Sequence, residues 1–540
     1  MIMEFMQIKP ITISTLSPVH IGCGIDYEPT NYVMDGDCLY PFPWIDEAAF
    51  ATEEQLRNLL AQAGSIQGLW HIFHSETHLN TMKSLAGRFL PMKSGIKKQQ
   101  DQRIQQMQFP LIIERTAFDP ISDLPILPGT GLKGAIRTAL LEYLAREQNF
   151  PEASYVFKNK NTQIQERLMG GSFASDPLRL LKISDAMLDA NCSEPTRILS
   201  KQSRHRKDNS ATSVRDATQN FPECIEPFMA EAFRSELTIL ENRNTWLEAD
   251  QKRQIRNIPF DQIVLACNTF YQERLEAHRE MMRTTECCAW YEQIMPLVTQ
   301  AIREKRGFLL RIGKYAGADY LALKQYRRIT TKYEKNPTAQ TLPISTNRCH
   351  DGQNTYPFGW IFVEVDQVKN GIATPLQAGL RKLRTQHTDT NLAVQRKQAF
   401  LNLCKETQAR LAVQKVSIAV KAEESKRHQI AKEAAKREED EREAARQAAL
   451  ATMSPNQRAI EELRAEIENK LKGGKLKISD AFWGGRIKKL AEQALAGADW
   501  SAEEKTALAD MLQEWAGKLM ALEPKELRKN LKLAALRGQV

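Results

Sequence analysis

A glycine-rich stretch of ten residues, Pro128–Arg137 (PGTGLKGAIR), marks the place where an apolar segment ends and a helix begins. Residues 124–127, just before it, read as the end of a short strand. After it, apolar side chains recur at the spacing of an amphipathic helix, at Ala135, Ile136, Ala139, Leu140, Tyr143 and Leu144. This order of strand, glycine-rich turn and helix favours a fold in which helices pack on a sheet.

The same stretch carries the chemistry of a phosphate site. Gly129, Gly131 and Gly134 would let the backbone pass close to a ligand, and the new helix offers unpaired N–H groups and the positive end of its dipole. Lys133 and Arg137 would add full positive charges. The motif is not the ATP-binding loop GxxxxGKS/T, because no lysine followed by serine or threonine stands at the required spacing, so a polynucleotide backbone fits better than a nucleoside triphosphate. The alternative is a turn whose glycines are kept for packing.

Length, charge and cysteine content limit the class of protein. At roughly 100 to 200 residues per domain, 540 residues predict three or four units. The nine cysteines form no CxxC pair, so neither a zinc ribbon nor a secreted disulfide framework is indicated, and we expect no metal or cofactor. The sequence has no apolar run of about 18 residues and no signal-peptide pattern, which favours a cytoplasmic protein without membrane contact. The net charge of +9 is modest for this length, so local clusters of charge are more informative than the total.

Secondary-structure signals alternate along the first two thirds of the chain. Gln7–Thr15 has the alternation of a half-buried strand, and a hairpin is expected around Asp35 and Gly36, a pair suited to a tight turn. We interpret the basic, glutamine-rich segment Lys93–Gln108 as a flexible insertion. Further strands are expected at Ile112–Arg115, Leu180–Ser184, Phe233–Leu240 and Phe308–Ile312, and helices at Asp46–Leu60, Ile66–His74 and Asp261–Arg283.

The composition changes after residue 365. Lys421–Leu450 holds eight basic and eight acidic side chains with no glycine or proline, which predicts a long helix. Because it lacks a wide apolar stripe, a solvent-exposed spacer is favoured over a coiled coil.

A compact helical module is expected beyond the spacer, in residues 456–540. Ser501 and Glu504 have the spacing of a capping box, and Pro524 suits the first turn of another helix. Aromatic bulk for a small core comes from Trp483, Trp500 and Trp515.

Several segments resemble a known family. Together with Leu16–Gly24 (LSPVHIGCG), the sequence PGTGLKGAIRTALL resembles the glycine-rich signature of the RAMP superfamily, the RNA-binding subunits of CRISPR effector complexes. Four later segments are similar, in the same order, to type III-A (Csm-type) members: Asp176–Asp185 (DPLRLLKISD), Pro222–Pro227 (PECIEP), Arg311–Gly317 (RIGKYAG, a second glycine-rich loop) and Pro357–Val363 (PFGWIFV, a closing strand). The set resembles the subunit that caps the 3′ end of the guide RNA, and it covers roughly residues 1–366.

The resemblance implies an α+β fold with two RRM-like (ferredoxin-like) domains and helical insertions, followed here by an all-α extension. The expected segments are 1–228, 229–366, a charged helical spacer at 367–455 and the helical module at 456–540. It also implies a non-catalytic subunit that binds the guide RNA (crRNA) and supports crRNA maturation and antiviral defence. The implied partners are crRNA, other RAMP subunits, the large subunit of a type III-A complex and a recruited nuclease.

The residues expected to contact RNA follow the two glycine-rich loops. In the first loop they are Gly129, Gly131, Lys133, Gly134 and Arg137. In or after the second loop, the expected phosphate contacts are Lys314, Lys324, Arg327 and Arg328. Bases could stack on Tyr27, Tyr32 and Tyr315, although each ring could equally fill the core.

Two residues keep an enzymatic alternative open. His20 could act as a general acid or base in metal-independent RNA cleavage, but the sequence assigns no second group to stabilise the scissile phosphate, and a structural contact is the alternative. Asp26 lies roughly where a neighbouring subunit of such complexes carries a metal-dependent aspartate, although the residues after it depart from that pattern. Asp176, Asp185 and Asp189 are interpreted as helix-cap and turn residues rather than a metal cluster.

A third alternative places the function in the extension. In that hypothesis the protein is an adaptor, and residues 456–540 recruit a nuclease or a small helical subunit.

Overall fold

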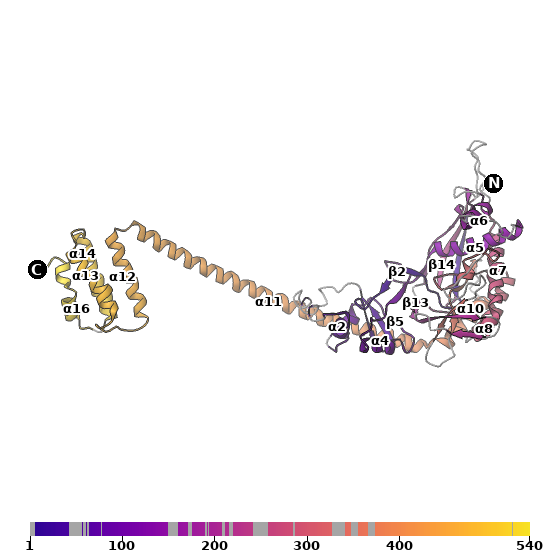
Figure 1. Cartoon of the computed structure of the whole chain (residues 1–540), viewed down its shortest axis with the longest axis horizontal. Helices are drawn as coiled ribbons and strands as arrows, with labels where there is room; N and C mark the ends of the chain where they lie inside the picture. The colour runs from indigo at the N-terminus through magenta and orange to yellow at the C-terminus, as the bar shows by residue number, and fades with distance from the viewer. Residues whose placement is uncertain are drawn as a thin grey trace, which may run out of the picture. The chain divides into compact units, whose positions relative to one another are not determined.

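The computed structural model describes residues 6–42, 57, 61, 64–76, 78–149, 160–170, 175–189, 192, 194–207, 211–214, 220–240, 257–283, 287–326, 341–346, 355–365, 373–520 and 522–539. The chain divides into two compact units, Met1–Val416 and Ser417–Val540. Their elements are labelled in Figure 1, and each unit is treated by itself.

A seven-stranded antiparallel sheet forms the centre of the first unit. Its order is β15–β18–β1–β14–β9–β7, and β8 also pairs with β14. The long strand β1 (Met6–Thr15) pairs with β14 (Phe233–Leu240) on one side and with β18 (Trp360–Val365) on the other. The predicted segments 1–228 and 229–366 therefore share one sheet. The other strands are β7 (Ile126–Leu127), β8 (Leu181–Ile183), β9 (Ala186–Leu188) and β15 (Gly307–Arg311).

Helices α5 (Gly129–Glu147), α7 (Phe260–Ala277) and α9 (Cys288–Arg303) pack against this sheet, and α5 also packs against α7. Two buried side chains fix their positions. The amide of Asn268 on α7 donates to the carbonyl of Gly307 at 3.1 Å and accepts the N–H of Leu309 at 3.0 Å. The indole of Trp290 on α9 donates to the carbonyl of Leu16 at 2.7 Å. Two shorter helices complete this region, α6 (Lys160–Leu168) and α8 (Arg279–Arg283).

Three smaller sheets surround the central one. Their orders are β10–β13–β6–β2, β12–β11–β16–β17 and β3–β4–β5. The predicted hairpin is confirmed as β3–β4, and Gly36 in its turn has a φ of +57°. The strands are β2 (Gly22–Tyr27), β3 (Tyr32–Asp35), β4 (Cys38–Pro41), β5 (Leu90–Pro91), β6 (Ile113–Thr116), β10 (Thr196–Ile198), β11 (Ser200–Lys207), β12 (Ala211–Val214), β13 (Phe221–Ile225), β16 (Thr341–Thr346) and β17 (Tyr356–Pro357).

The segment interpreted as a flexible insertion is ordered, so that prediction is wrong. Residues 96–105 form helix α4, preceded by α2 (Ile66–Phe73) and α3 (Leu79–Leu85). Ile96, Gln100 and Ile104 are buried on one face of α4, and the Gln100 side chain accepts the N–H of Leu111 at 2.7 Å. The glutamine-rich composition hid this spacing of four residues, which is that of a helix face.

Acidification should weaken this α-helical layer through His74. Burial lowers the pKa of His74 to about 4. In the folded protein, Nε2 of His74 accepts the N–H of Met34 at 3.0 Å and the ring stacks on Trp70. The folded protein thus favours the neutral ring. Its contribution is complete above pH 6.5 and is lost as the pH falls toward 4. We expect His74→Gln to reduce the loss of stability between pH 7 and pH 4.5 by about 2 kcal/mol, measured by denaturant titration at both pH values. An unchanged pH dependence would contradict this.

The first unit continues well beyond residue 366. Helix α10 (Pro375–His387) begins at a capping box on Thr374 and buries Leu376, Leu380 and Leu383 in the core of the central sheet. The 63-residue helix α11 (Thr390–Thr452) then packs Phe400 against Tyr40 and Phe89. The predicted boundary at residue 366 is therefore too early, because α10 and the first part of α11 pack against the core of this unit.

The second unit is a small helical bundle with a core of its own (Figure 1). The predicted capping box of Ser501 and Glu504 is present, and Pro524 stands in the first turn of a helix. Trp483 is buried, and Trp500 and Trp515 pack partly buried against the core. Its elements are α12 (Pro455–Leu471), a π-helical segment (Trp483–Lys488), α13 (Lys489–Ala496), α14 (Ala502–Met511), a second π-helical segment (Leu512–Ala516), α15 (Gly517–Leu519), α16 (Pro524–Asn530) and α17 (Leu533–Leu536).

The structure thus has the mixed α+β architecture with a helical C-terminal region that was predicted. The long helix expected at Lys421–Leu450 is confirmed and starts 31 residues earlier, at Thr390. The helix expected at Asp46–Leu60 falls almost entirely outside the described residues. Within the described part of the chain, no helix has the length and apolar character that a membrane span requires.

Candidate nucleic-acid interface

The first glycine-rich loop forms the start of helix α5, and its three glycines have different surroundings. Gly129 is buried, and a Cβ at this position would overlap the carbonyl oxygen of Ile183 and lie 2.8 Å from that of Ser184. Its N–H donates to Oδ1 of Asp185 at 2.7 Å, so a carboxylate of the protein itself occupies the end of the helix. For Gly129, the packing explanation is therefore sufficient.

Gly131 and Gly134 lie on the exposed face of α5, and a Cβ at either position would meet nothing within 4 Å. Packing therefore gives no reason for glycine at these two positions. Each glycine in a helix costs about 1 kcal/mol relative to alanine. The two glycines leave a strip of bare backbone along the first two turns of α5, where a bulky ligand can approach closely.

The two cations of the loop flank this strip. The Lys133 ammonium donates to the carbonyl of Leu181 at 2.9 Å, and partial burial lowers its pKa. Arg137 forms an ion pair with Asp176 at 2.6 Å and donates to the Gln165 side chain at 3.1 Å. Both side chains are half-buried, so they are held in place beside the glycines rather than free in solvent.

Asp176 itself caps a short 3-10 helix by accepting the N–H of Leu178 at 2.9 Å, which confirms its interpretation as a cap residue.

The second glycine-rich loop docks on the segment around His20, although about 290 residues separate them in the sequence. Gly313 has a φ of +93°, and a Cβ there would overlap the carbonyl oxygen of His20. The same carbonyl accepts the N–H of Lys314 at 3.0 Å, and the N–H of Gly359 donates to the carbonyl of Pro18 at 2.8 Å. The loop therefore requires glycine at position 313 to close against the start of the chain.

Glu114 on β6 gathers the polar side chains of this region. It accepts the Lys314 ammonium at 3.0 Å, the Asn220 amide at 2.7 Å and the Tyr315 hydroxyl. Burial alone would raise the pKa of Glu114, but these hydrogen bonds and the Lys314 charge hold it below its usual value. The sequence analysis missed this residue; its only signal was a charged side chain inside an otherwise apolar predicted strand.

His20 is a structural residue in this arrangement. Its ring is 1% exposed and stacks on Tyr315, and Nδ1–H donates to the carbonyl of Glu223 at 2.8 Å. Nε2 faces the Glu114 carboxylate at 3.4 Å, and burial lowers the pKa of His20. The structure does bring a lysine and a tyrosine beside His20, the second groups that the sequence could not assign. Both are bound to Glu114, and His20 itself is buried.

The other catalytic candidate, Asp26, is exposed on strand β2 opposite Glu114. Among the described residues, no group of three or more histidine, cysteine, aspartate or glutamate side chains is placed to hold a metal ion. Asp26 therefore lies without a described set of metal ligands around it.

The aromatic residues considered for base stacking are buried. The ring of Tyr315 is 7% exposed, Tyr27 donates to Glu223 at 3.1 Å, and Tyr32 donates to the carbonyl of Leu111 at 2.6 Å. Of the two alternatives that the sequence left open for these rings, the structure shows the second: each ring packs in a hydrophobic core. Lys314 is half exposed, and Lys324 lies near the end of the described loop, whereas Arg327 and Arg328 lie outside the described residues.

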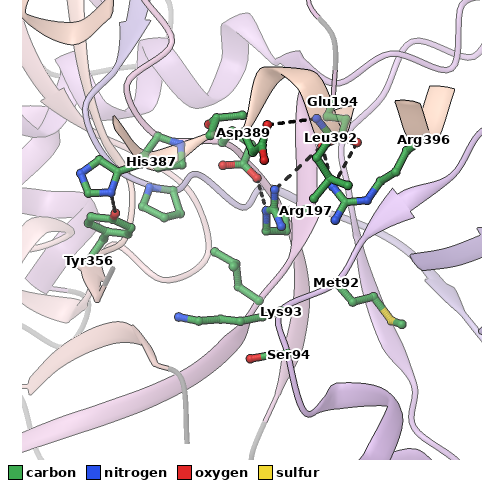
Figure 2. Close-up of a pocket in the computed structure, with 15 residues that line it drawn as sticks. Met92, Lys93, Ser94, Glu194, Arg197, Tyr356, His387, Asp389, Leu392 and Arg396 are labelled. Atoms are coloured by element: carbon green, nitrogen blue, oxygen red, sulfur yellow. Dashed lines mark hydrogen bonds and ion pairs between the residues drawn. The ribbon is translucent and has the colours of Figure 1, made fainter. Parts of the chain in front are cut away.

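A separate cavity of about 310 Å³ lies at the junction of α10 and α11 (Figure 2). Arg197 in its wall pairs with Glu226 at 2.5 Å, and Arg396 on α11 lies 3.4 Å from Glu194. Burial lowers the pKa of Lys93, which extends along the cavity, to about 8. The Arg396 ion pair connects α11 to the rest of the first unit. Because both arginines are paired with carboxylates, the cavity lining does not favour one class of ligand.

Known proteins similar to this chain are found both through its sequence and through its fold. Residues 12–266 match the family model described as the RAMP superfamily. None of the curated proteins matches the sequence. Among solved structures, a chain of a Csm–crRNA–target RNA ternary complex from a type III-A CRISPR–Cas system aligns with a TM-score of 0.40 and 15% identity, covering 66% of this chain and 100% of the other. T. onnurineus Csm5 aligns with a TM-score of 0.39 and 15% identity, with the same coverage.

The matched residues include the segment around His20 and the whole first glycine-rich loop, so the sequence resemblance and the family model agree on the same part of the chain. Residues 12–266 of this chain are thus similar to the RAMP superfamily.

Proposed function

We propose that this protein is a non-catalytic guide-RNA-binding subunit of a type III-A CRISPR effector complex, where it caps the 3′ end of the crRNA. In this role it supports crRNA maturation and antiviral defence in the cytoplasm, beside other RAMP subunits and the large subunit of the complex. The RAMP superfamily match of residues 12–266 supports the family part of this proposal. The aligned ternary complex consists of Csm, crRNA and target RNA, and crRNA is the partner proposed for this chain.

The observation that carries RNA binding is the bare, exposed strip of backbone at Gly131 and Gly134, flanked by Lys133 and Arg137. Two glycines in a helix cost stability, and neither is required by packing. A phosphate backbone can contact exposed main chain and nearby cations without reading any base. Because the guide sequence changes with each spacer, such sequence-independent contacts are the kind that a guide-binding subunit requires.

The strip is tested by filling it. In the full chain, Gly131→Gln with Gly134→Gln should weaken binding of a labelled single-stranded guide RNA at least tenfold, because the new side chains block approach to the backbone. The melting temperature should stay equal or rise, since glutamine is the better helix former. Gly87→Gln is the matched control, because Gly87 is also exposed with nothing within 4 Å of its Cβ. Fluorescence anisotropy measures the affinity, and equal affinity of both variants would refute the RNA site.

The electrostatic part of the site has a separate readout. Lys133→Gln with Arg137→Gln should make the slope of log affinity against log salt shallower by about 0.7 for each phosphate that is no longer neutralised. The same RNA, run on a denaturing gel with and without divalent metal, tests the enzymatic alternative. RNA that stays intact supports a binding subunit. Shortening that disappears in His20→Ala or Asp26→Ala would establish a ribonuclease instead.

A further inference from the structure

A strongly basic segment lies in the second unit, outside the residues that match the RAMP superfamily model. Residues 470–489 (KLKGGKLKISDAFWGGRIKK) contain seven lysines and arginines and one acidic residue, Asp480. The Asp480 carboxylate is already used, since it accepts the N–H of Phe482 at 2.9 Å. All seven cations are exposed.

Several cations elsewhere in this unit are paired with carboxylates. Arg464 lies 3.5 Å from Glu461, Lys518 pairs with Glu514 at 2.8 Å, and Arg537 pairs with Asp510 at 2.7 Å. Within residues 470–489, two of the seven cations lie close to a described carboxylate. Arg486 pairs with Glu466, and Lys488 lies 3.8 Å from Glu492. No ion pair within the described residues involves four other lysines of this segment, Lys472, Lys475, Lys477 and Lys489.

The local backbone holds these lysines on the outside. Leu476 donates its N–H to the carbonyl of Leu519 at 2.8 Å and packs against the bundle core. Because side chains alternate along an extended segment, Lys475 and Lys477 on either side of Leu476 are turned to solvent. Helix α16 also carries the exposed cations Lys525, Arg528 and Lys529.

The same segment holds a second pair of glycines that packing does not explain. Gly484 and Gly485 are exposed within the π-helical segment Trp483–Lys488, and a Cβ at either would meet nothing within 4 Å. Packing does not require them, and π-helical turns are frequent at functional sites. Bare helical backbone next to cations is also the arrangement at Gly131 and Gly134 in the first unit.

The chemistry of this surface favours one class of partner. An interface with a protein has a desolvated core of apolar side chains, and a membrane-binding helix needs an apolar face. In the described part of the second unit beyond α11, Ile478 is the one large apolar side chain that is markedly exposed, at 50%. A nucleic-acid backbone needs cations and accessible main chain and little apolar contact.

We propose that Lys472, Lys475, Lys477 and Lys489, together with Gly484 and Gly485, form a second nucleic-acid-binding surface that contacts the phosphate backbone. This surface lies outside the region that carries the proposed guide-RNA function, and it does not depend on that function. The backbone that it contacts can belong to the guide, to a target RNA or to DNA, and the experiment separates these sources.

The test uses the full chain with the first site weakened by Gly131→Gln and Gly134→Gln. In this background, replacing Lys472, Lys475, Lys477 and Lys489 by glutamine should lower the affinity for nucleic acid at least tenfold at 0.1 M salt. The salt slope should become shallower by roughly 3, at about 0.7 for each single-strand phosphate that is no longer neutralised. The matched control replaces four exposed lysines of α11, Lys421, Lys426, Lys432 and Lys436, by glutamine, and should change neither quantity.

The probes are a single-stranded RNA, a single-stranded DNA and a duplex DNA of the same sequence. The probe that binds with the highest affinity identifies the kind of nucleic acid that this surface contacts. A single-stranded RNA carrying 4-thiouridine should form ultraviolet crosslinks to peptides of residues 470–489. Thermal melting of each variant confirms that the bundle is folded. Equal salt slopes for the two lysine variants, no crosslinks in this segment, or equal competition by polyglutamate would overturn the proposal, the last in favour of an acidic protein partner.

Discussion

A chain that ends at residue 366 should aggregate on expression, whereas a chain that ends at residue 416 should fold with a cooperative thermal transition. The shorter chain lacks α10, whose Leu376, Leu380 and Leu383 are buried in the main core. Burying a leucine contributes about 1.5 to 3 kcal/mol. Losing three such side chains removes an amount comparable to the whole stability of a typical domain, about 5 to 15 kcal/mol.

A point substitution gives the same test in milder form. Leu380→Ala in the full chain should cost about 2 to 5 kcal/mol, because the side chain is fully buried and the cavity can collapse only partly. Leu401→Ala is the control, since Leu401 lies on α11 and is 43% exposed. The yields of the two truncated chains and denaturant titrations of the two variants are the measurements. A chain 1–366 that is soluble and melts like 1–416 would show that α10 is dispensable.

The glycines of the first loop should respond to alanine in opposite directions. Gly129→Ala forces a methyl group into the carbonyl oxygens of Ile183 and Ser184, which are backbone atoms of β8 and the residue after it, so neither can move like a flexible side chain. We expect a loss of more than about 3 kcal/mol, at the upper end of overpacking in a core. Gly131→Ala meets nothing and should instead stabilise α5 by up to about 1 kcal/mol.

Chemical denaturation of the two single variants measures this difference in stability. The RNA affinity of each variant is the second measurement. Gly131→Ala should gain stability while losing affinity, because the methyl group covers exposed backbone. If Gly129→Ala is as stable as the parent, the close contact with β8 is relaxed at little cost and the structural role assigned to Gly129 is wrong.

The glycine-rich motif of the candidate site could be predicted from the sequence, but the contacts around the site could not. The strand–turn–helix order around Gly129 was readable because glycines, a lysine and a helical apolar pattern stand within twenty residues. The docking of Gly313 on His20 was not readable, because nothing local marks a contact between segments about 290 residues apart. For the same reason, the sequence could not predict whether Tyr315 is buried. Its position depends on Glu114 and Asn220, which come from two other parts of the chain.

The amino-acid composition led to a wrong prediction for a helix that buries only a few side chains. Helix α4 buries only three positions in ten, and one of them is Gln100, so its amphipathic pattern was masked by polar residues. The boundary at residue 366 follows from the family resemblance, which ends there. Helix α10 is short and mixed in character, and its three leucines at spacings of four and three residues were the signal that it packs on the core.

The position of β1 in the middle of the central sheet has a consequence for synthesis of the protein on the ribosome. Ile11 pairs with Val365, and Ile13 pairs with both Phe233 and Val363. Strand β1 can therefore pair with β18 only after roughly 350 further residues have been translated. At about 5 to 20 residues per second, that wait lasts roughly 20 to 70 seconds. During this time a strand with an apolar buried half has an open edge, which is a template for pairing with other nascent chains. Production of this protein should therefore depend on chaperones that bind the emerging N-terminus, and slower translation should lower its soluble yield.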